Sequence, residues 1–144
     1  WGGIMKPSSA KHKGRKFQQQ IRDLLITTLG IHEEDIESRS MGAGGEDLIM
    51  ARAAREKFPL SIECKNQESL NVWKSYKQAE ANCGKYEPVL FMKRNNQKAL
   101  VVVDAEFFVN LFKKGEDNEL IENLKYKMPE IEGFKFPEII KGEE

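Results

Sequence analysis

The chain has 144 residues, a length that suits one compact domain with its own hydrophobic core. Apolar residues make up 40% and charged residues 32%, and no run approaches the roughly 20 apolar residues that span a bilayer. No basic segment followed by an apolar run opens the chain, so we expect neither a membrane protein nor a secreted one. Cys64 and Cys83 are too few for a disulfide framework or a four-thiolate zinc site, and we expect reduced thiols in the cytoplasm.

The net charge is zero, but its distribution along the chain is uneven. Residues 1–114 carry 19 Lys and Arg against 14 Asp and Glu, whereas residues 115–144 carry four against nine. A basic body can bind phosphate even when the whole chain is neutral, because the local field matters more than the sum. Charge alone equally fits an ordinary solvated surface.

Residues 1–12 lack periodicity and contain glycine, proline and serine, which predicts a flexible N-terminal arm. From Lys13 the pattern becomes helical, and Gly30 ends the helix. Apolar side chains at helical spacing predict its buried face: Phe17, Ile21, Leu24, Leu25 and Leu29. Short strands are predicted over residues 36–40, 47–51 and 60–65, with a glycine-rich turn over residues 41–45.

The second half of the chain alternates between helix and strand. Asn71 is expected to cap a helix that runs to about Asn82, with Val72, Tyr76, Ala79 and Cys83 at core spacing. Two apolar runs, residues 89–92 and 99–103, predict strands joined by a turn at Asn95 and Asn96. A helix after Asp104 holds Phe107, Phe108, Leu111 and Phe112, and one more helix is expected near residues 119–124. The order predicts an α/β fold over residues 13–114, followed by an acidic extension over residues 115–144.

The strand over residues 60–65 carries the most informative pattern. Alternate side chains of a strand point to opposite faces, so Ile62 and Cys64 face a core while Glu63 and Lys65 share the other face. A carboxylate and an ammonium on a buried face need partners or a metal ion.

A second carboxylate, Asp47, opens a strand just after the glycine-rich turn, sixteen residues before Glu63. If the two strands pair as an antiparallel hairpin, both carboxylates meet at one end of the sheet. Magnesium prefers such hard oxygen ligands, and it can polarise a phosphate and lower the pKa of a water molecule. Lys65 beside that water can orient it or stabilise charge on the phosphoryl oxygens.

Residues 45–49 (Gly-Glu-Asp-Leu-Ile) and 62–65 (Ile-Glu-Cys-Lys) resemble the signature of the PD-(D/E)xK nuclease superfamily. That signature is an Asp, a gap of about the size found between these segments, and then Glu-x-Lys. The core of that superfamily also has this order of elements: a helix, three antiparallel strands, a second helix and a further strand. Within it, the chain is similar to small Holliday-junction resolvases and related phage-type endonucleases. The resemblance covers residues 13–112 and implies a restriction-endonuclease-like core, with a mixed central β-sheet of about five strands flanked by helices.

The resemblance implies a magnesium-dependent DNA endonuclease, with manganese as an alternative cation. It assigns Asp47 and Glu63 as metal ligands, the carbonyl of Cys64 as a third ligand, and Lys65 as the catalytic base or charge stabiliser. Gln78 falls in the helix where many members place a polar residue that faces the active site.

The chain departs from the pattern at two positions. Gln18 or Gln19 stands where resolvases often carry a Glu in the first helix, which leaves the number of metal ions in the site open. Glu46 replaces the proline before the catalytic Asp, and strand alternation points its side chain away from Asp47.

The implied substrate is DNA, with a Holliday junction as the first choice, cut in the cytoplasm or, for a phage-encoded protein, in the host cytoplasm. Symmetric cutting of a junction requires two active sites and therefore a homodimer. Basic residues are expected to hold the phosphates in sequence-independent binding. They are Lys11, Lys13, Arg15, Lys16 and Arg39.

Other interpretations remain open at this point. The chain can be a nicking, flap, restriction or repair nuclease of the same fold, or a non-catalytic DNA-binding domain, although the intact Asp47, Glu63 and Lys65 argue against the latter. Alternatively, Glu63 and Lys65 form a surface salt bridge and Asp47 caps a turn. Trp73 and Tyr76 can stack on bases, but their helical spacing favours a place in the core.

Overall fold

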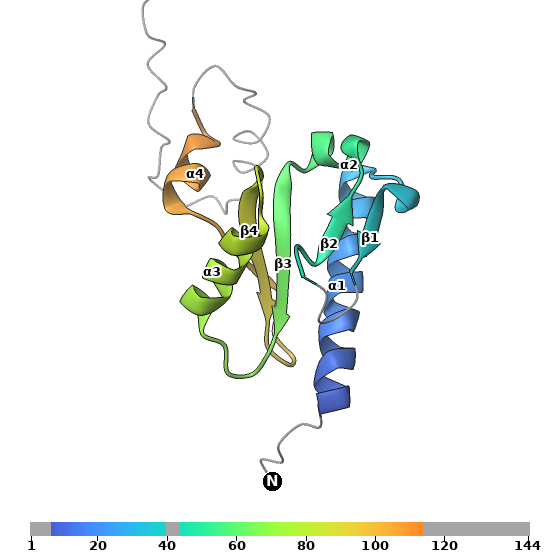
Figure 1. Cartoon of the computed structure of the whole chain (residues 1–144), viewed down its shortest axis with the longest axis vertical. Coiled ribbons are helices and arrows are strands. Elements are labelled where there is room, and N and C mark those ends of the chain that lie inside the picture. The colour runs from blue at the N-terminus through green and yellow to red at the C-terminus, as the bar shows by residue number, and fades with distance from the viewer. Residues whose placement is uncertain (1–6, 40–43, 114–144) are drawn as a thin grey trace, which may run out of the picture. The chain divides into compact units, whose positions relative to one another are not determined.

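The computed structural model describes residues 7–39 and 44–113, which form an α/β fold (Figure 1). The chain divides into one unit that ends at Asp104 and a second that begins at Ala105. The first unit contains α1 (Pro7–Leu29), the 3-10 turn η1 (Glu33–Asp35), β1 (Ile36–Ser38), β2 (Leu48–Met50), α2 (Arg52–Lys57), β3 (Leu60–Asn66), α3 (Val72–Asn82), β4 (Glu87–Lys93) and β5 (Leu100–Val102). In the second unit, α4 spans Ala105–Asn110.

The strands of the described residues form two sheets rather than the single five-stranded sheet expected. β1 and β2 pair antiparallel, and β3, β4 and β5 form the second sheet. β3 pairs parallel with β4 over seven residues, and β4 pairs antiparallel with β5. The predicted antiparallel hairpin between the strands of Asp47 and Glu63 is not formed: β2 pairs with β1, and β3 pairs with β4. The Asp47 segment reaches the free edge of β3 without forming a ladder there.

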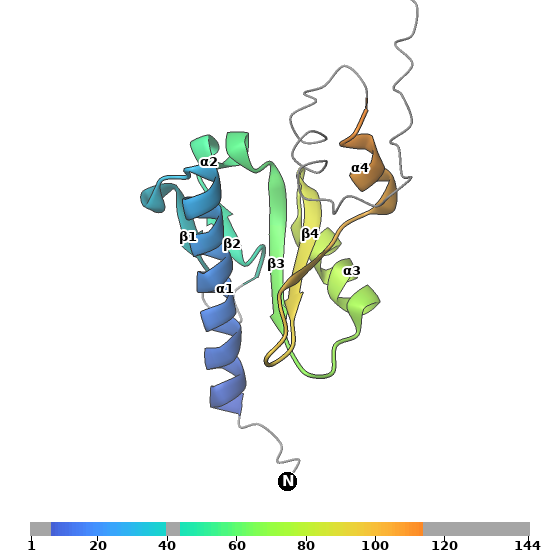
Figure 2. The same ribbon diagram turned by 180° about the vertical axis from the view of Figure 1, so that it is seen from behind.

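One hydrophobic core joins the two sheets through α1. Phe17, Ile21 and Leu25 of this helix are buried against Leu48 of β2 and Ile62 of β3. α3 covers the opposite face of the strands, as the two views in Figure 1 and Figure 2 show. Its buried positions, Ser75 and Ala79, are small, which lets the helix approach the sheet closely.

α1 begins at Pro7, six residues before the start predicted at Lys13, so residues 7–12 are helical and not part of an arm. Proline suits the first position of a helix because its missing N–H has no intrahelical partner there. Leu24 and Leu29 were expected on the buried face but are 51% and 38% exposed. The buried face is narrower than predicted: Phe17, Ile21 and Leu25 are buried in the core, and Ile26 packs against the core while partly exposed.

Several predicted features of the second half are confirmed. The Asn71 side chain caps α3 by accepting a hydrogen bond from the Lys74 amide at 3.0 Å. Asn96 has a positive φ of 58° in the turn between β4 and β5, a conformation that Asn tolerates better than most residues. Trp73 is 80% exposed, so its predicted place in the core is wrong.

In the second unit, Phe108 and Phe112 pack edge to face with ring centroids 5.4 Å apart. The helix expected near residues 119–124 and the acidic extension lie outside the described residues. No described helix is both long and apolar enough to cross a membrane.

Gly30 ends α1 in the left-handed conformation, with φ at 67°, and its amide donates to the Ile26 carbonyl at 3.0 Å. We expect Gly30→Ala to lower the free energy of unfolding by about 1 kcal/mol, because a Cβ disfavours this conformation. Gly44→Ala is the matched control, since a Cβ at this position would meet no atom of the described residues within 4 Å and its φ is not left-handed. Urea unfolding followed by circular dichroism measures both variants, and equal losses would contradict this role of Gly30.

Candidate active site

Asp47 is attached at two points to the edge of β3 that does not pair with β4. Its amide donates to the Ile62 carbonyl at 2.9 Å, and its Oδ2 accepts a hydrogen bond from the Cys64 amide at 2.7 Å. The carboxylate therefore takes the place that a carbonyl of a neighbouring strand would occupy in a regular ladder. Asp47 and Glu63 thus approach each other, as predicted, although the strands do not form the predicted hairpin.

Glu63 lies on the α3 side of β3 and is only 2% exposed. Its Oε2 is buried and has no hydrogen-bond partner in the described part of the chain. Burial and the nearby charge of Asp47 raise the pKa of Glu63 from 4.5 to about 7, against the opposing effects of Lys65 and of a hydrogen bond from Asn82. Burial also raises the pKa of Asp47, opposed mainly by the hydrogen bond from Cys64.

Lys65 follows Glu63 on the same strand face, and its Nζ lies 3.7 Å from Glu63 Oε1. Its side chain is 22% exposed while that of Glu63 is 3% exposed, so the pair is not an ordinary surface salt bridge. The two carboxylates and this ammonium form one electrostatic group, because the charge of Lys65 lowers the pKa of both acids.

A pocket contains Asp47, Glu63 and Lys65, and two amide side chains of α3, Gln78 and Asn82, also line it. Gln78 was predicted there, whereas Asn82 was not singled out from the sequence. Its spacing of four residues from Gln78 was the available signal, since residues i and i+4 share one face of a helix. Gln18 of α1 also lines the pocket, where its Oε1 accepts a hydrogen bond from the Ser38 hydroxyl at 2.7 Å.

The pocket brings together all four predicted catalytic residues and Cys64. The Cys64 side chain packs in the hydrophobic core, and burial raises the pKa of its thiol well above the ordinary value. Its thiol is therefore protonated and faces away from the chemistry, so its backbone is the part that can serve the pocket. The lining is Ala10, Lys11, Gly14, Gln18, Gly44, Gly45, Asp47, Glu63, Cys64, Lys65, Asn66, Gln67, Gln78 and Asn82.

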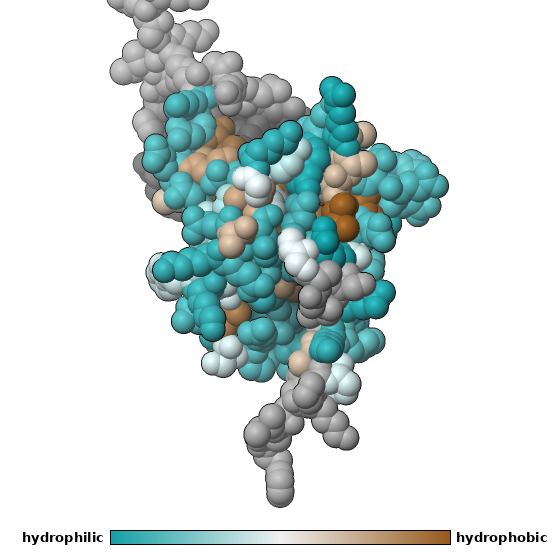
Figure 3. Space-filling view, in the orientation of Figure 1, coloured by the Kyte–Doolittle hydropathy of each residue, from teal (hydrophilic) through white to brown (hydrophobic). Residues whose placement is uncertain are grey.

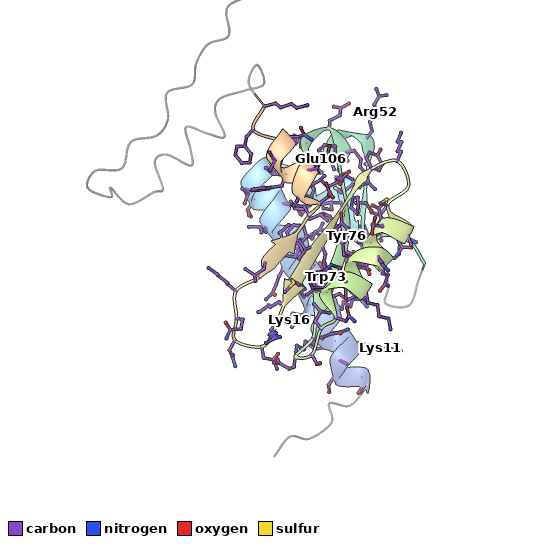
Figure 4. All side chains as sticks on the ribbon, turned by 90° about the vertical axis from the view of Figure 1, so that its left-hand side faces the viewer. Lys11, Lys16, Arg52, Trp73, Tyr76 and Glu106 are labelled. Atoms are coloured by element: carbon purple, nitrogen blue, oxygen red, sulfur yellow. The ribbon has the colours of Figure 1, made fainter. Side chains whose placement is uncertain are left out.

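The basic residues predicted to bind DNA are distributed over three places. Lys11 lines the pocket that contains Asp47 and Glu63, and Figure 4 shows Lys11 with Lys16 on the N-terminal half of α1. Lys13 and Lys16 line a separate groove next to the pocket, and Arg15 lines neither. Arg39 donates to the Glu46 carbonyl at 2.9 Å and packs against Gly45, so it supports the segment that carries Asp47.

Glu46 forms an ion pair with Arg55 of α2 and does not line the pocket that contains Asp47. This agrees with the expectation that its side chain points away from Asp47. The Arg55 guanidinium also stacks 4.2 Å from the centroid of the Tyr86 ring. The network holds the residue before Asp47 on the side opposite to the pocket.

Comparison with known families shows which family the chain belongs to. Residues 9–136 match the family described as "Phage putative PDDEXK endonuclease". The chain belongs to this endonuclease family. The match includes every residue of the pocket and confirms the predicted resemblance to the PD-(D/E)xK superfamily in a phage-type context. No curated protein and no solved structure matches the chain.

Members of the PD-(D/E)xK superfamily use divalent metal ions, and the donors of this pocket suit one. The described residues contain no cluster of three or more His, Cys, Asp or Glu side chains able to hold a metal. Magnesium does not need such a cluster, because it binds through one or two carboxylates and retains several waters. The unpartnered Oε2 of Glu63 is a hard oxygen of the required kind.

Because the pKa of Glu63 is raised, we expect ionised Glu63 to lower the free energy of unfolding of the metal-free protein. Glu63 loses its proton near pH 4.5 when unfolded and near pH 7 when folded, so the folded state loses stability as the pH rises between these values. We expect Glu63→Gln to raise the free energy of unfolding at pH 8 by up to about 3 kcal/mol. At pH 4 the gain should vanish, because Glu63 is then neutral in both states.

Urea unfolding in EDTA between pH 4 and pH 8 measures this difference. Glu37→Gln is the control, because Glu37 is an exposed residue of β1. A Glu63→Gln gain that does not depend on pH would contradict the assignment.

Proposed function

We propose that the protein hydrolyses phosphodiester bonds of DNA in a magnesium-dependent reaction, with manganese as an alternative cation. The observation that carries the proposal is the convergence of Asp47, Glu63 and Lys65 in one pocket, with a buried and unpartnered oxygen on Glu63. Family membership supports the same reaction class. If Glu63 and Lys65 formed only a structural ion pair, Asp47 would not be needed beside them, and its charge raises the pKa of Glu63.

Asp47, Glu63 and the Cys64 carbonyl would hold the cation, which supplies Lewis-acid polarisation of the scissile phosphate when bound. Asp47 retains one oxygen for this role, because its Oδ2 already accepts from the Cys64 amide. Both carboxyls must be ionised to bind a cation, so metal binding and loss of the Glu63 proton are coupled.

Lys65 stabilises the negative charge that develops on the phosphoryl oxygens, or orients the attacking water. Its side chain is partly exposed and is held beside Glu63, so its ammonium can reach a phosphate at the mouth of the pocket. Gln78 is exposed on α3 and can donate and accept hydrogen bonds, which suits a group that orients water.

For the substrate we propose branched DNA, with the Holliday junction as first choice, cut by a homodimer in the cytoplasm of the cell or of the infected host. The support is the similarity to resolvases and the phage-type family. A dimer related by twofold symmetry presents two equivalent sites to the two strands that a resolvase must cut.

Isosteric substitutions test the metal ligands. Asp47→Asn keeps an oxygen that can accept from the Cys64 amide but loses its charge, and we expect cleavage to fall by at least about 10²–10³-fold. Glu63→Gln should have the same effect, while DNA affinity measured in EDTA stays near wild type. Glu37→Gln again serves as the control. Near-wild-type turnover of either pocket variant in magnesium would refute the proposed site.

Lys65→Ala should lose cleavage to a similar extent but keep its magnesium affinity, because an ammonium does not ligate a cation. Isothermal titration calorimetry separates the two effects. A collapse of metal affinity together with activity would assign Lys65 a structural role instead.

The substrate is tested by competition among four-way junction, flap and linear duplex DNA of equal length. We expect the junction to bind at least about tenfold more tightly than the duplex, and paired nicks to appear at related positions of opposing strands. Asp47→Asn is the control for contaminating nucleases. Equal affinity for duplex, or a single unpaired nick, would refute the junction assignment and leave the hydrolytic chemistry standing.

A further inference from the structure

A second hollow lies beside the catalytic pocket, between α1 and the hairpin of β4 and β5. The groove has a volume of about 430 Å³ and is lined mainly by polar side chains. Its lining is Lys13, Lys16, Phe17, Gln20, Asn66, Lys93, Asn95 and Asn96. In Figure 4 the hairpin extends toward the N-terminal half of α1, where Lys16 projects.

Asn66 connects this groove to the catalytic pocket, because it lines both. It is the last residue of β3 and follows Lys65 directly. Its Oδ1 is buried and has no hydrogen-bond partner in the part of the chain that the structure describes. An amide can also turn its NH₂ group to this position, where a phosphate oxygen would accept a hydrogen bond. A bound chain can therefore pass from the pocket to the groove across Asn66.

The hairpin is held in place by Glu68. Its Oε1 accepts a hydrogen bond from the backbone N–H of Asn95 at 2.7 Å and lies 3.5 Å from Lys13 Nζ. This single acid thus ties the hairpin to α1. Both walls of the groove therefore contact Glu68.

The charges around the groove are strongly biased. Lys13, Lys16 and Lys93 line it, and Arg94 and Lys98 line the adjoining hollow on the other side of the hairpin. Glu68 is the one acid among the residues that line these two hollows, and it is already paired. The cations come from α1 and from the hairpin, and Lys16, Arg94 and Lys98 are exposed, whereas Lys13 and Lys93 are partly buried. Charges spread over two elements suit successive phosphates of a chain rather than one small anion.

We infer that this groove and the outer side of the hairpin bind the DNA backbone next to the scissile phosphate. Lys93, Arg94 and Lys98 then extend the DNA surface beyond the helix α1. The inference rests on the proposed nuclease function, because the catalytic pocket defines which phosphate is cut. The hairpin then forms a second wall of the DNA-binding surface, in addition to the basic residues near the N-terminus. Figure 3 shows that the face seen there is mainly hydrophilic, with only scattered apolar areas.

The first test removes three hairpin charges by the triple substitution Lys93→Ser, Arg94→Ser and Lys98→Ser. DNA affinity is measured by fluorescence anisotropy with labelled DNA in EDTA, over a series of salt concentrations. We expect at least about tenfold weaker binding, and a log–log salt slope that is less negative by roughly 2 to 3, at about 0.9 for each lost contact. Preferential binding of RNA of the same sequence would contradict DNA as the partner.

The matched control substitutes Arg52, Lys57 and Lys85 by serine, which removes the same number of Lys and Arg charges. These residues are exposed and line neither the groove nor the pocket. Figure 4 shows Arg52 at the end of the first unit opposite to Lys11 and Lys16. The control should keep the wild-type slope, and an equal loss in both triple variants would overturn the inference. If the hairpin variant does not fold, Arg94→Ser and Lys98→Ser are measured singly, each with an expected slope change of about 0.9.

The second test locates the contacts along the DNA. Single neutral methylphosphonate linkages are placed at successive positions on either side of the cleaved bond. Wild-type protein should lose affinity at a few neighbouring positions on one side, and the hairpin variant should show no further loss there, because the contact is already absent. Equal additional losses in both proteins would overturn the inference. Failure of the proposed function would appear separately, as Asp47→Asn protein that still cuts DNA.

Discussion

The two-point attachment of Asp47 to β3 is the constraint on which the rest of the structure depends. One edge of β3 is occupied by a continuous parallel ladder with β4. The other edge receives the Asp47 amide at Ile62 and the Asp47 carboxylate at the Cys64 amide. A side chain thus occupies a ladder position, and regular pairing stops there. The separation into two sheets and the position of the Asp47 carboxylate are the same structural feature.

The alternation of β3 lets the fold tolerate a costly cluster of charges. Ile62 and Cys64 are buried on the α1 side, where each fully buried apolar side chain stabilises the fold by roughly 1.5–3 kcal/mol. Glu63 and Lys65 lie on the α3 side, where burial and Asp47 raise the pKa of Glu63. One face therefore stabilises the strand, and the other carries the groups that are suited to bind a cation and a phosphate. Such a division is common where a binding site is destabilising before it is filled.

The elements around β3 contribute in different ways. α3 supplies amides to the pocket through Gln78 and Asn82, and its small buried residues allow close packing on the sheet. α1 supplies apolar side chains to the core along one face and basic side chains to the solvent along its N-terminal half. The Glu46–Arg55 ion pair supports the segment before Asp47 from outside the pocket. The proposed chemistry and the proposed DNA contacts therefore use different faces of the same few elements.

Local patterns in the sequence determined most of the secondary-structure elements and the types of side chain that meet in the pocket. The alternation over residues 60–65, the Asn71 cap and the Asn95–Asn96 turn depend on neighbours within a few residues, so they were predictable. The spacing of Asp47 and Glu-x-Lys likewise predicted which side chains meet, and all lie in one pocket. Only the tertiary structure decided how they meet. The pairing of β1 with β2 and of β3 with β4, the exposure of Trp73 and the place of Asn66 in the pocket depend on contacts between distant segments, and such contacts leave no local periodicity in the chain.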